Sequence, residues 1–154
     1  MTKKTYNERL HNTDDMPRIE DMSENETFIK RYGGTQMLIA APMQYNKIMA
    51  RVPKGKIITS ETVRAYLAKE AGATSTCHMT AGLFINICAH ASVERGETDF
   101  PWWRTLRSKG ELNDKCPEGL LGHKARLESE GHEIIPKGKK MYIKDYEKSL
   151  WDIE

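Results

Sequence analysis

The sequence predicts one mainly helical domain of the α+β class, and three observations support that prediction. Val63, Leu67 and Ala71 repeat at a spacing of four, which is typical of a helix with one buried face. Residues 77–92 are apolar nearly all round, which is typical of a buried helix. Residues 132–146 hold two short apolar runs around PKGKK, which predicts a β-hairpin. A chain of 154 residues is long enough for one core and too short for two ordinary domains.

The first part of the chain predicts an extension followed by the domain. Residues 1–32 are polar and poor in apolar periodicity, so we interpret them as a loosely packed arm before a domain of residues 33–154. The apolar run GGTQMLIAAP, residues 33–42, predicts a strand. The segment MQYNKIMARV then predicts a short helix that ends before Pro53. Its candidate buried residues are Met43, Ile48 and Met49.

The middle of the chain predicts a helix-turn-helix. Thr59 or Ser60 is a good N-cap for the first helix, and Gly72 ends it. The turn GATST leads into the second helix, in which Ala81 and Gly82 are small enough to let another helix pass close. Any helical hairpin has this spacing, so the spacing alone is weak evidence. A β-hairpin beside such a pair is the pattern of a winged helix.

Two adjacent tryptophans, Trp102 and Trp103, stand in DFPWWRTLRSKGEL. Neighbouring residues of an extended segment point to opposite faces, which would bury one indole and expose the other. The alternative is an irregular loop that both rings anchor. After this loop, GHKARLESEG predicts a helix with Leu121 and Leu127 inward, closed by Gly131.

Charge is unevenly distributed although the net charge is only +2. Residues 28–75 carry 8 Lys and Arg against 2 Asp and Glu, a net of +6, whereas residues 1–27 have a net of −3 from 4 against 7. Such a surplus attracts an anionic partner such as a phosphate backbone. Ordinary surface solvation is the alternative explanation. The lysines of PKGKK are likewise either a solvated turn or, in a wing, phosphate contacts.

Several classes of protein and site are not expected. No apolar run approaches the ~18 residues of a membrane span, and the N-terminus does not resemble a signal peptide. Three cysteines without C-x-x-C spacing indicate reduced thiols in a cytoplasmic protein. The spacing of Cys77, His78, Cys88 and His90 matches no zinc pattern, so we expect neither a metal nor a cofactor. We also expect a monomer.

The segment PWWRTLRSKGEL…GLLGHKARLESEGHEI resembles the active-site region of the alkylguanine-DNA alkyltransferases. That family has a Pro-Cys-His-Arg loop, matched by Pro101 to Arg104, and a Ser-x-Gly turn, matched by Ser108 to Gly110. Glu130 and Gly131 match the Glu-Gly at the end of its next helix. The tail IKDYEKSLW is similar to the ending of the alkyltransferase-like proteins, which keep the fold and have lost the nucleophile.

The resemblance extends upstream, so that it covers roughly residues 50–151. Gly55 with IITSETVRAYLAKEAG resembles the family's first DNA-binding helix, although this helix is about four residues longer here. CHMTAGLFIN resembles its recognition helix, with Asn86 at a buried asparagine. Ser60 falls near the family's phosphate-rotating tyrosine, and Cys77 falls where an arginine fills the gap left by a flipped base. These two departures make base flipping a separate question from DNA binding.

The resemblance implies an α+β, mainly helical, winged helix-turn-helix-like DNA-binding domain of the alkyltransferase type with an N-terminal extension. Trp102 and Trp103 occupy the positions of the catalytic cysteine and histidine, and indole is neither a nucleophile nor a base near neutral pH. We therefore expect no enzyme, but a DNA-repair protein that recognises alkylated or distorted double-stranded DNA and works with a repair-protein partner. The alternative is a protein-interaction or regulatory module whose pocket is closed by its own tryptophans.

The site residues that follow from this resemblance form two groups. Those expected to bind DNA are Lys54, Lys56, Ser60, Arg64, Thr76, Cys77, His78 and Thr80. Those expected around a base pocket are Trp102, Trp103, Arg104, Ser108 and Asn86. Within the second group, Trp102 is the expected base contact and Trp103 the expected core residue. We interpret Arg104 first as a structural ion-pair or backbone-bonding residue and second as a phosphate contact.

Overall fold

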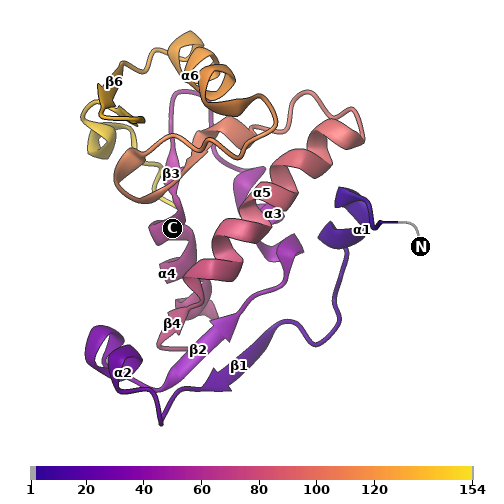
Figure 1. Cartoon of the computed structure of the whole chain (residues 1–154), viewed down its shortest axis with the longest axis vertical. Coiled ribbons are helices and arrows are strands. Elements are labelled where there is room, and N and C mark those ends of the chain that lie inside the picture. The colour runs from indigo at the N-terminus through magenta and orange to yellow at the C-terminus, as the bar shows by residue number, and fades with distance from the viewer. Residues whose placement is uncertain (1–2, 154) are drawn as a thin grey trace.

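The computed structural model describes residues 3–153, which form six α-helices and seven short strands (Figure 1). The helices are α1 (Tyr6–Leu10), α2 (Glu26–Tyr32), α3 (Pro42–Met49), α4 (Ser60–Ala71), α5 (His78–Glu94) and α6 (Gly119–Ser129). The strands are β1 (Arg18–Asp21), β2 (Gln36–Ile39), β3 (Ile58–Thr59), β4 (Ser75–Thr76), β5 (Thr105–Leu106), β6 (Ile134–Lys137) and β7 (Lys140–Ile143). Three 3-10 turns are η1 (Trp102–Arg104), η2 (Ser108–Gly110) and η3 (Tyr146–Ser149). The predicted α+β class is confirmed.

Helix α5 is the centre of the molecule. Figure 1 shows it running through the middle, with α2 and the β1–β2 pair at one end of the long axis and α6 with β6 at the other. Ala81, Cys88 and Ala91 are fully buried, because α1, α3, α4 and η1 all pack against α5. This cover explains most of its apolar sequence, although Met79, Leu83 and Val93 on the same helix are exposed. None of the helices within residues 3–153 is both long and apolar enough to span a bilayer.

The N-terminal segment differs from the loosely packed arm expected of residues 1–32. Leu10 is buried against the core, and the Glu94 carboxylate at the end of α5 accepts the backbone N–H groups of Tyr6 and Asn7, both at 3.0 Å. Strand β1 pairs with β2 in antiparallel register, so the predicted boundary at residue 33 falls between two paired strands. These elements of four to seven residues are too short for a periodic signal, and packing on α5 and β2 stabilises them.

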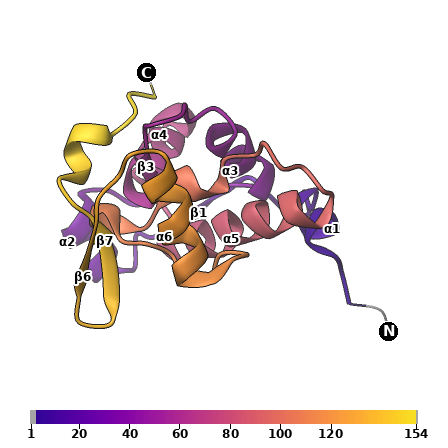
Figure 2. The ribbon, with the colours of Figure 1, turned by 90° about the horizontal axis from the view of Figure 1, so that it is seen from above.

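Parallel pairing of β3 with β5 brings the start of α4 next to the chain that follows η1. Ile58 is opposite Thr105, and Thr59 is opposite Leu106. This pairing places the start of α4, which the Thr59 hydroxyl caps, beside the chain that leaves the tryptophan turn. The predicted β6–β7 hairpin is present and lies alongside α6 (Figure 2). The helix pair α4–α5 is also where the sequence predicts it.

Two helix faces differ in detail from the sequence pattern. Ala71 is exposed, whereas Val63 and Leu67 form the inward face of α4 as predicted. Leu121 was expected to point inward, but it is 72% exposed. The inward face of α6 is instead formed by His123 and Leu127, four residues apart. The buried histidine hid this periodicity, because histidine does not count as apolar in a sequence pattern.

Candidate nucleic-acid interface

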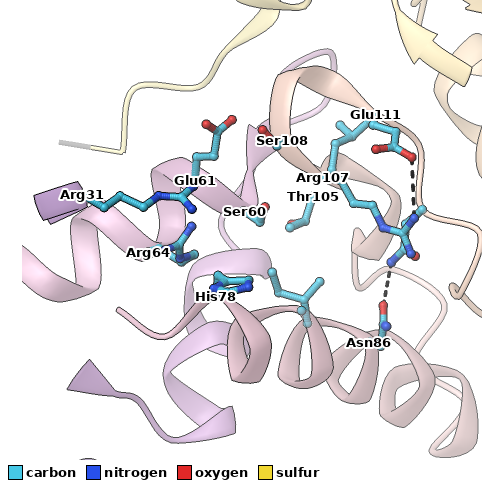
Figure 3. Close-up of a pocket in the computed structure, with 14 residues that line it drawn as sticks. Arg31, Ser60, Glu61, Arg64, His78, Asn86, Thr105, Arg107, Ser108 and Glu111 are labelled. Atoms are coloured by element: carbon cyan, nitrogen blue, oxygen red, sulfur yellow. Dashed lines mark hydrogen bonds and ion pairs between the residues drawn. The ribbon is translucent and has the colours of Figure 1, made fainter. Parts of the chain in front are cut away.

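A cavity of about 400 Å³ lies between the beginnings of α4 and α5 and the chain that follows the tryptophan turn (Figure 3). Ser60 and Ser108 both line it, across from His78 and Asn86 of α5, so we call it the Ser60–Ser108 cavity (Figure 3). Its volume falls within the range of sites for small molecules and single nucleotides. The β3–β5 pairing brings the two walls together, because both walls follow directly from those strands.

One end of this cavity is cationic. Arg31 from α2 and Arg64 from α4 line it, together with the Glu61 carboxylate and the His78 ring (Figure 3). The Arg64 guanidinium donates from Nε to the Thr76 carbonyl at 3.0 Å and from Nη2 to the Tyr32 hydroxyl at 3.2 Å. Both acceptors are neutral, so they orient the guanidinium without cancelling its charge.

The other end is built from amides and an ion pair. The Asn113 Nδ2 donates to Asn86 Oδ1 at 2.6 Å, which joins the wall of the cavity to α5 (Figure 3). Arg107 pairs with Asp114 at 2.9 Å and with Glu111 at 3.7 Å. Amide and guanidinium groups at this end can donate to the polar edge of a base.

A buried histidine links this wall to the tryptophan turn. The Asn113 backbone N–H donates to His123 Nδ1 at 3.1 Å, and His123 Nε2–H donates to the Trp103 carbonyl at 2.8 Å. Burial lowers the pKa of His123 below its usual value, which keeps the ring neutral as Nδ1 acceptance requires. The position of Asn113 therefore depends on the structure of the turn.

The tryptophan turn is closed, and neither ring lines the Ser60–Ser108 cavity. Trp102 is 4% exposed and Trp103 is 9% exposed, because the two residues lie on a 3-10 turn and not on an extended strand. Their rings meet edge to face with centroids 5.7 Å apart, and the Arg126 guanidinium lies 4.6 Å from the Trp103 centroid. The expectation that one ring would face outward is wrong, whereas the alternative of a loop anchored by both rings agrees with the structure.

Arg104 has the structural role that was the first interpretation of it. It binds the Glu130 carboxylate through Nε at 3.0 Å and through Nη2 at 2.6 Å, and its Nη1 donates to the Val52 carbonyl at 2.8 Å. The Glu130 side chain is 6% exposed. Burial is the largest single effect on Glu130 and would raise its pKa, but the hydrogen bonds and charge of Arg104, together with smaller contributions from Trp103 and the Gly55 backbone, hold the pKa below its usual value.

The remaining sequence-predicted residues divide by position. Those that line the Ser60–Ser108 cavity are Ser60, Arg64, His78, Asn86 and Ser108. Thr76 is 1% exposed, and its hydroxyl donates to the Arg64 carbonyl, so its side chain is not available to DNA in this structure. Cys77 and Thr80 are partly exposed at the start of α5, outside the cavity. Lys54 and Lys56 are exposed on the turn before β3 and do not line the cavity.

None of the three thiols is placed for chemistry in this cavity. Among residues 3–153, no cysteine side chain lines it. Cys88 and Cys116 are buried, and burial raises the pKa of both thiols, which disfavours the thiolate that a nucleophile needs. Within the same range, no group of three His, Cys, Asp or Glu side chains is arranged to hold a metal ion.

Sequence reasoning missed three residues of this surface. Arg31 lies in the segment interpreted as a loose arm, and no local pattern brings it near Arg64. Met79 and Leu83 are 73% and 55% exposed on the first turns of α5. A signal existed for these two, since a helix that is apolar all round must have one face without cover if it also lies at a surface.

Comparisons with known proteins give a likeness in structure. No family model and no curated protein matches the chain. Two similar solved structures are S. pombe Atl1 in complex with damaged DNA containing O6-carboxymethylguanine, with a TM-score of 0.52, and S. pombe ATL in complex with DNA, with a TM-score of 0.51. Each is 22% identical and covers 72% of this chain and 94% of its own. This chain has the fold of an alkyltransferase-like protein.

The Atl1 fold agrees with the fold that the sequence resemblance implied. The match leaves 28% of this chain uncovered. The roles expected of individual residues toward DNA stay predictions.

Proposed function

We propose that this protein binds double-stranded DNA and receives an alkylated base, rotated out of the helix, in the Ser60–Ser108 cavity without transferring the alkyl group. One observation carries the proposal: a nucleotide-sized cavity opens beside exposed helix α5, has a cationic end and an amide end, and has no cysteine among its described lining residues. Alkyl transfer needs a thiolate at the reacting atom, and no described lining residue supplies one.

The two ends of the cavity suit the two ends of a nucleotide. Arg64 and His78 stand where a phosphate would lie, and a guanidinium binds phosphate oxygens through paired hydrogen bonds. Asn86, Asn113 and Arg107 face the opposite end, where donors meet the edge of a base. Ile85 and Leu106 supply apolar wall between the two ends. Affinity would then come from phosphate contacts at the cationic end, and selectivity for the base would come from the donors at the amide end.

Helix α5 supports docking in a groove. Met79 and Leu83 are exposed one turn apart on the same face of it, and at Gly82 an added Cβ would meet no protein atom within 4 Å. Proteins that bind the minor groove insert apolar side chains of this kind between base steps and unstack them. We propose Met79 as the wedge that holds open the gap left by the rotated base, two residues after Cys77, which stands where the resemblance would place an arginine.

The test is a fluorescence-anisotropy titration with a duplex that carries one O6-alkylguanine and with the same duplex unmodified, each at two salt concentrations. We expect tighter binding to the alkylated duplex, weaker binding to both at higher salt, and an unchanged protein mass after incubation. Ser108→Phe should fill the cavity and remove the preference for the alkylated duplex, while Ser108→Ala should keep it. A stoichiometric alkyl adduct on a cysteine, or equal affinity for both duplexes, would contradict the proposal.

The second candidate is a protein-interaction module on the same fold. The burial of both tryptophans favours it, because a recognition loop without exposed rings offers no stacking platform of its own. Absence of salt-dependent DNA binding would favour this candidate. A repair-protein partner, a monomeric state and a cytoplasmic location belong to the first proposal and stay predictions.

A further inference from the structure

Helix α2 brings an arginine to the cationic end of the cavity from a segment far away in the sequence. The Asn25 side chain caps α2 by accepting the Phe28 N–H at 2.9 Å, and the Phe28 ring is buried. These two contacts anchor a helix of only seven residues. Its last turn carries Arg31, whose guanidinium lies 5.5 Å from the centroid of the Tyr32 ring. Arg31 is thus held at the surface on an anchored element.

Arg31 and Arg64 share two neighbouring hollows. Both line the Ser60–Ser108 cavity, and Figure 3 shows Arg31 reaching from α2 toward Glu61 and Arg64. Both also line a second hollow of about 450 Å³ between α2 and α4, which we call the α2–α4 hollow. Tyr32 connects the two arginines, since its ring faces Arg31 and its hydroxyl accepts from Arg64.

The charges around the α2–α4 hollow are unbalanced. Its described lining includes two guanidinium groups, those of Arg31 and Arg64, and one carboxylate, that of Glu61. Glu61 accepts the backbone N–H of Lys109 at 3.2 Å, on the side toward η2. Within residues 3–153, neither Arg31 nor Arg64 forms an ion pair with a carboxylate. Two guanidinium groups on one hollow repel each other until an anion lies between them.

We propose that α2 adds a phosphate-binding site to the DNA interface: a backbone phosphate next to the rotated nucleotide binds between Arg31 and Arg64. Planar guanidinium groups on two sides match the oxygens of a phosphodiester. The site widens the interface from α4 and α5 onto the N-terminal segment. It rests on the proposed function, because the phosphate belongs to the DNA whose base enters the Ser60–Ser108 cavity.

The first test compares Arg31→Ala with Lys30→Ala. Lys30 is the preceding residue of α2, carries the same charge, is exposed and lines neither hollow, so the two variants lose the same net charge. Loss of one phosphate contact reduces the log–log salt slope by about 0.9, so Arg31→Ala should weaken duplex binding about three- to fourfold more at 50 mM than at 200 mM salt. Lys30→Ala should change the slope by much less. Equal slopes for the two variants would overturn the proposal.

The second test locates the phosphate. Single methylphosphonate substitutions, which remove one backbone charge each, are scanned along the alkylated duplex. We expect one position at which neutralisation weakens the wild type severalfold and leaves Arg31→Ala unaffected. If the wild type loses affinity at the same positions and by the same factors as Arg31→Ala, the site does not exist, although DNA binding itself would stand. If the wild type does not bind the duplex, the proposed function fails first.

A free nucleotide offers the same phosphate chemistry, so a third titration replaces the duplex by deoxyguanosine monophosphate. We expect no saturable binding at concentrations at which the duplex saturates the protein. Tight binding of the mononucleotide that Arg31→Ala abolishes would assign the site to free nucleotides and overturn its assignment to the DNA backbone.

Discussion

Replacing Trp102 by alanine tests whether its indole belongs to the core or to the base. The ring is 4% exposed, lies edge to face with Trp103, and has the Arg126 guanidinium 5.4 Å from its centroid. Truncating a buried tryptophan to alanine costs about 3–5 kcal/mol, in which the ring and cation contacts are already included. For a protein of this size that loss lowers the melting temperature by about 6–20 °C. Because the unfolding free energies of proteins are only about 5–15 kcal/mol, the variant should be only marginally stable.

The assay pairs thermal melting with DNA titration at a temperature at which the variant is still folded. Trp151→Ala is the control, because Trp151 is half-buried in the tail, where it packs against Arg51, and should lose less stability. We expect Trp102→Ala to weaken binding to alkylated and plain duplexes by similar factors. A melting temperature as high as that of Trp151→Ala would refute the core assignment. A selective loss for alkylated DNA of about fivefold or more would show that the ring leaves its buried position to stack on the base.

Three further predictions concern other parts of the molecule. Glu130→Gln breaks the buried pair with Arg104 and should lower the free energy of unfolding by about 3 kcal/mol or more, measured by urea denaturation, whereas Glu118→Gln at the exposed pair should cost about 1 kcal/mol or less. The pKa of His123 is lower in the folded protein, so below about pH 6.5 the unfolded state binds more protons than the folded state. The melting temperature should therefore be steady above that pH and fall below it. In His123→Gln the fall should be shallower. Met79→Ala should weaken duplex binding about tenfold without loss of stability, while Leu121→Ala, equally exposed on α6, should not affect binding.

Local patterns were sufficient for much of the fold. The spacing of Val63 and Leu67 with a cap at Thr59 predicts α4, and the apolar run after it predicts α5. The hairpin β6–β7 follows from two short apolar runs around a glycine turn. The two tryptophans after Pro101 are likewise read directly from the sequence, and the absence of a nucleophile that they imply stays a prediction. These features depend on neighbours in the chain, which is why the sequence alone determined them.

The tertiary structure decided what depends on distant neighbours. Whether Trp102 is exposed depends on a 3-10 turn and on Arg126, which approaches from another helix. The short helices and strand of residues 6–32 are too short to be stable alone, and they form because they pack on α5 and pair with β2. Arg31 reaches the cavity because β1–β2 pairing and the buried Phe28 ring place α2 beside α4. Contacts between segments that are tens of residues apart leave no periodic trace in the sequence, so the sequence predicts the framework and the absent nucleophile, and packing decides which side chains face the cavity.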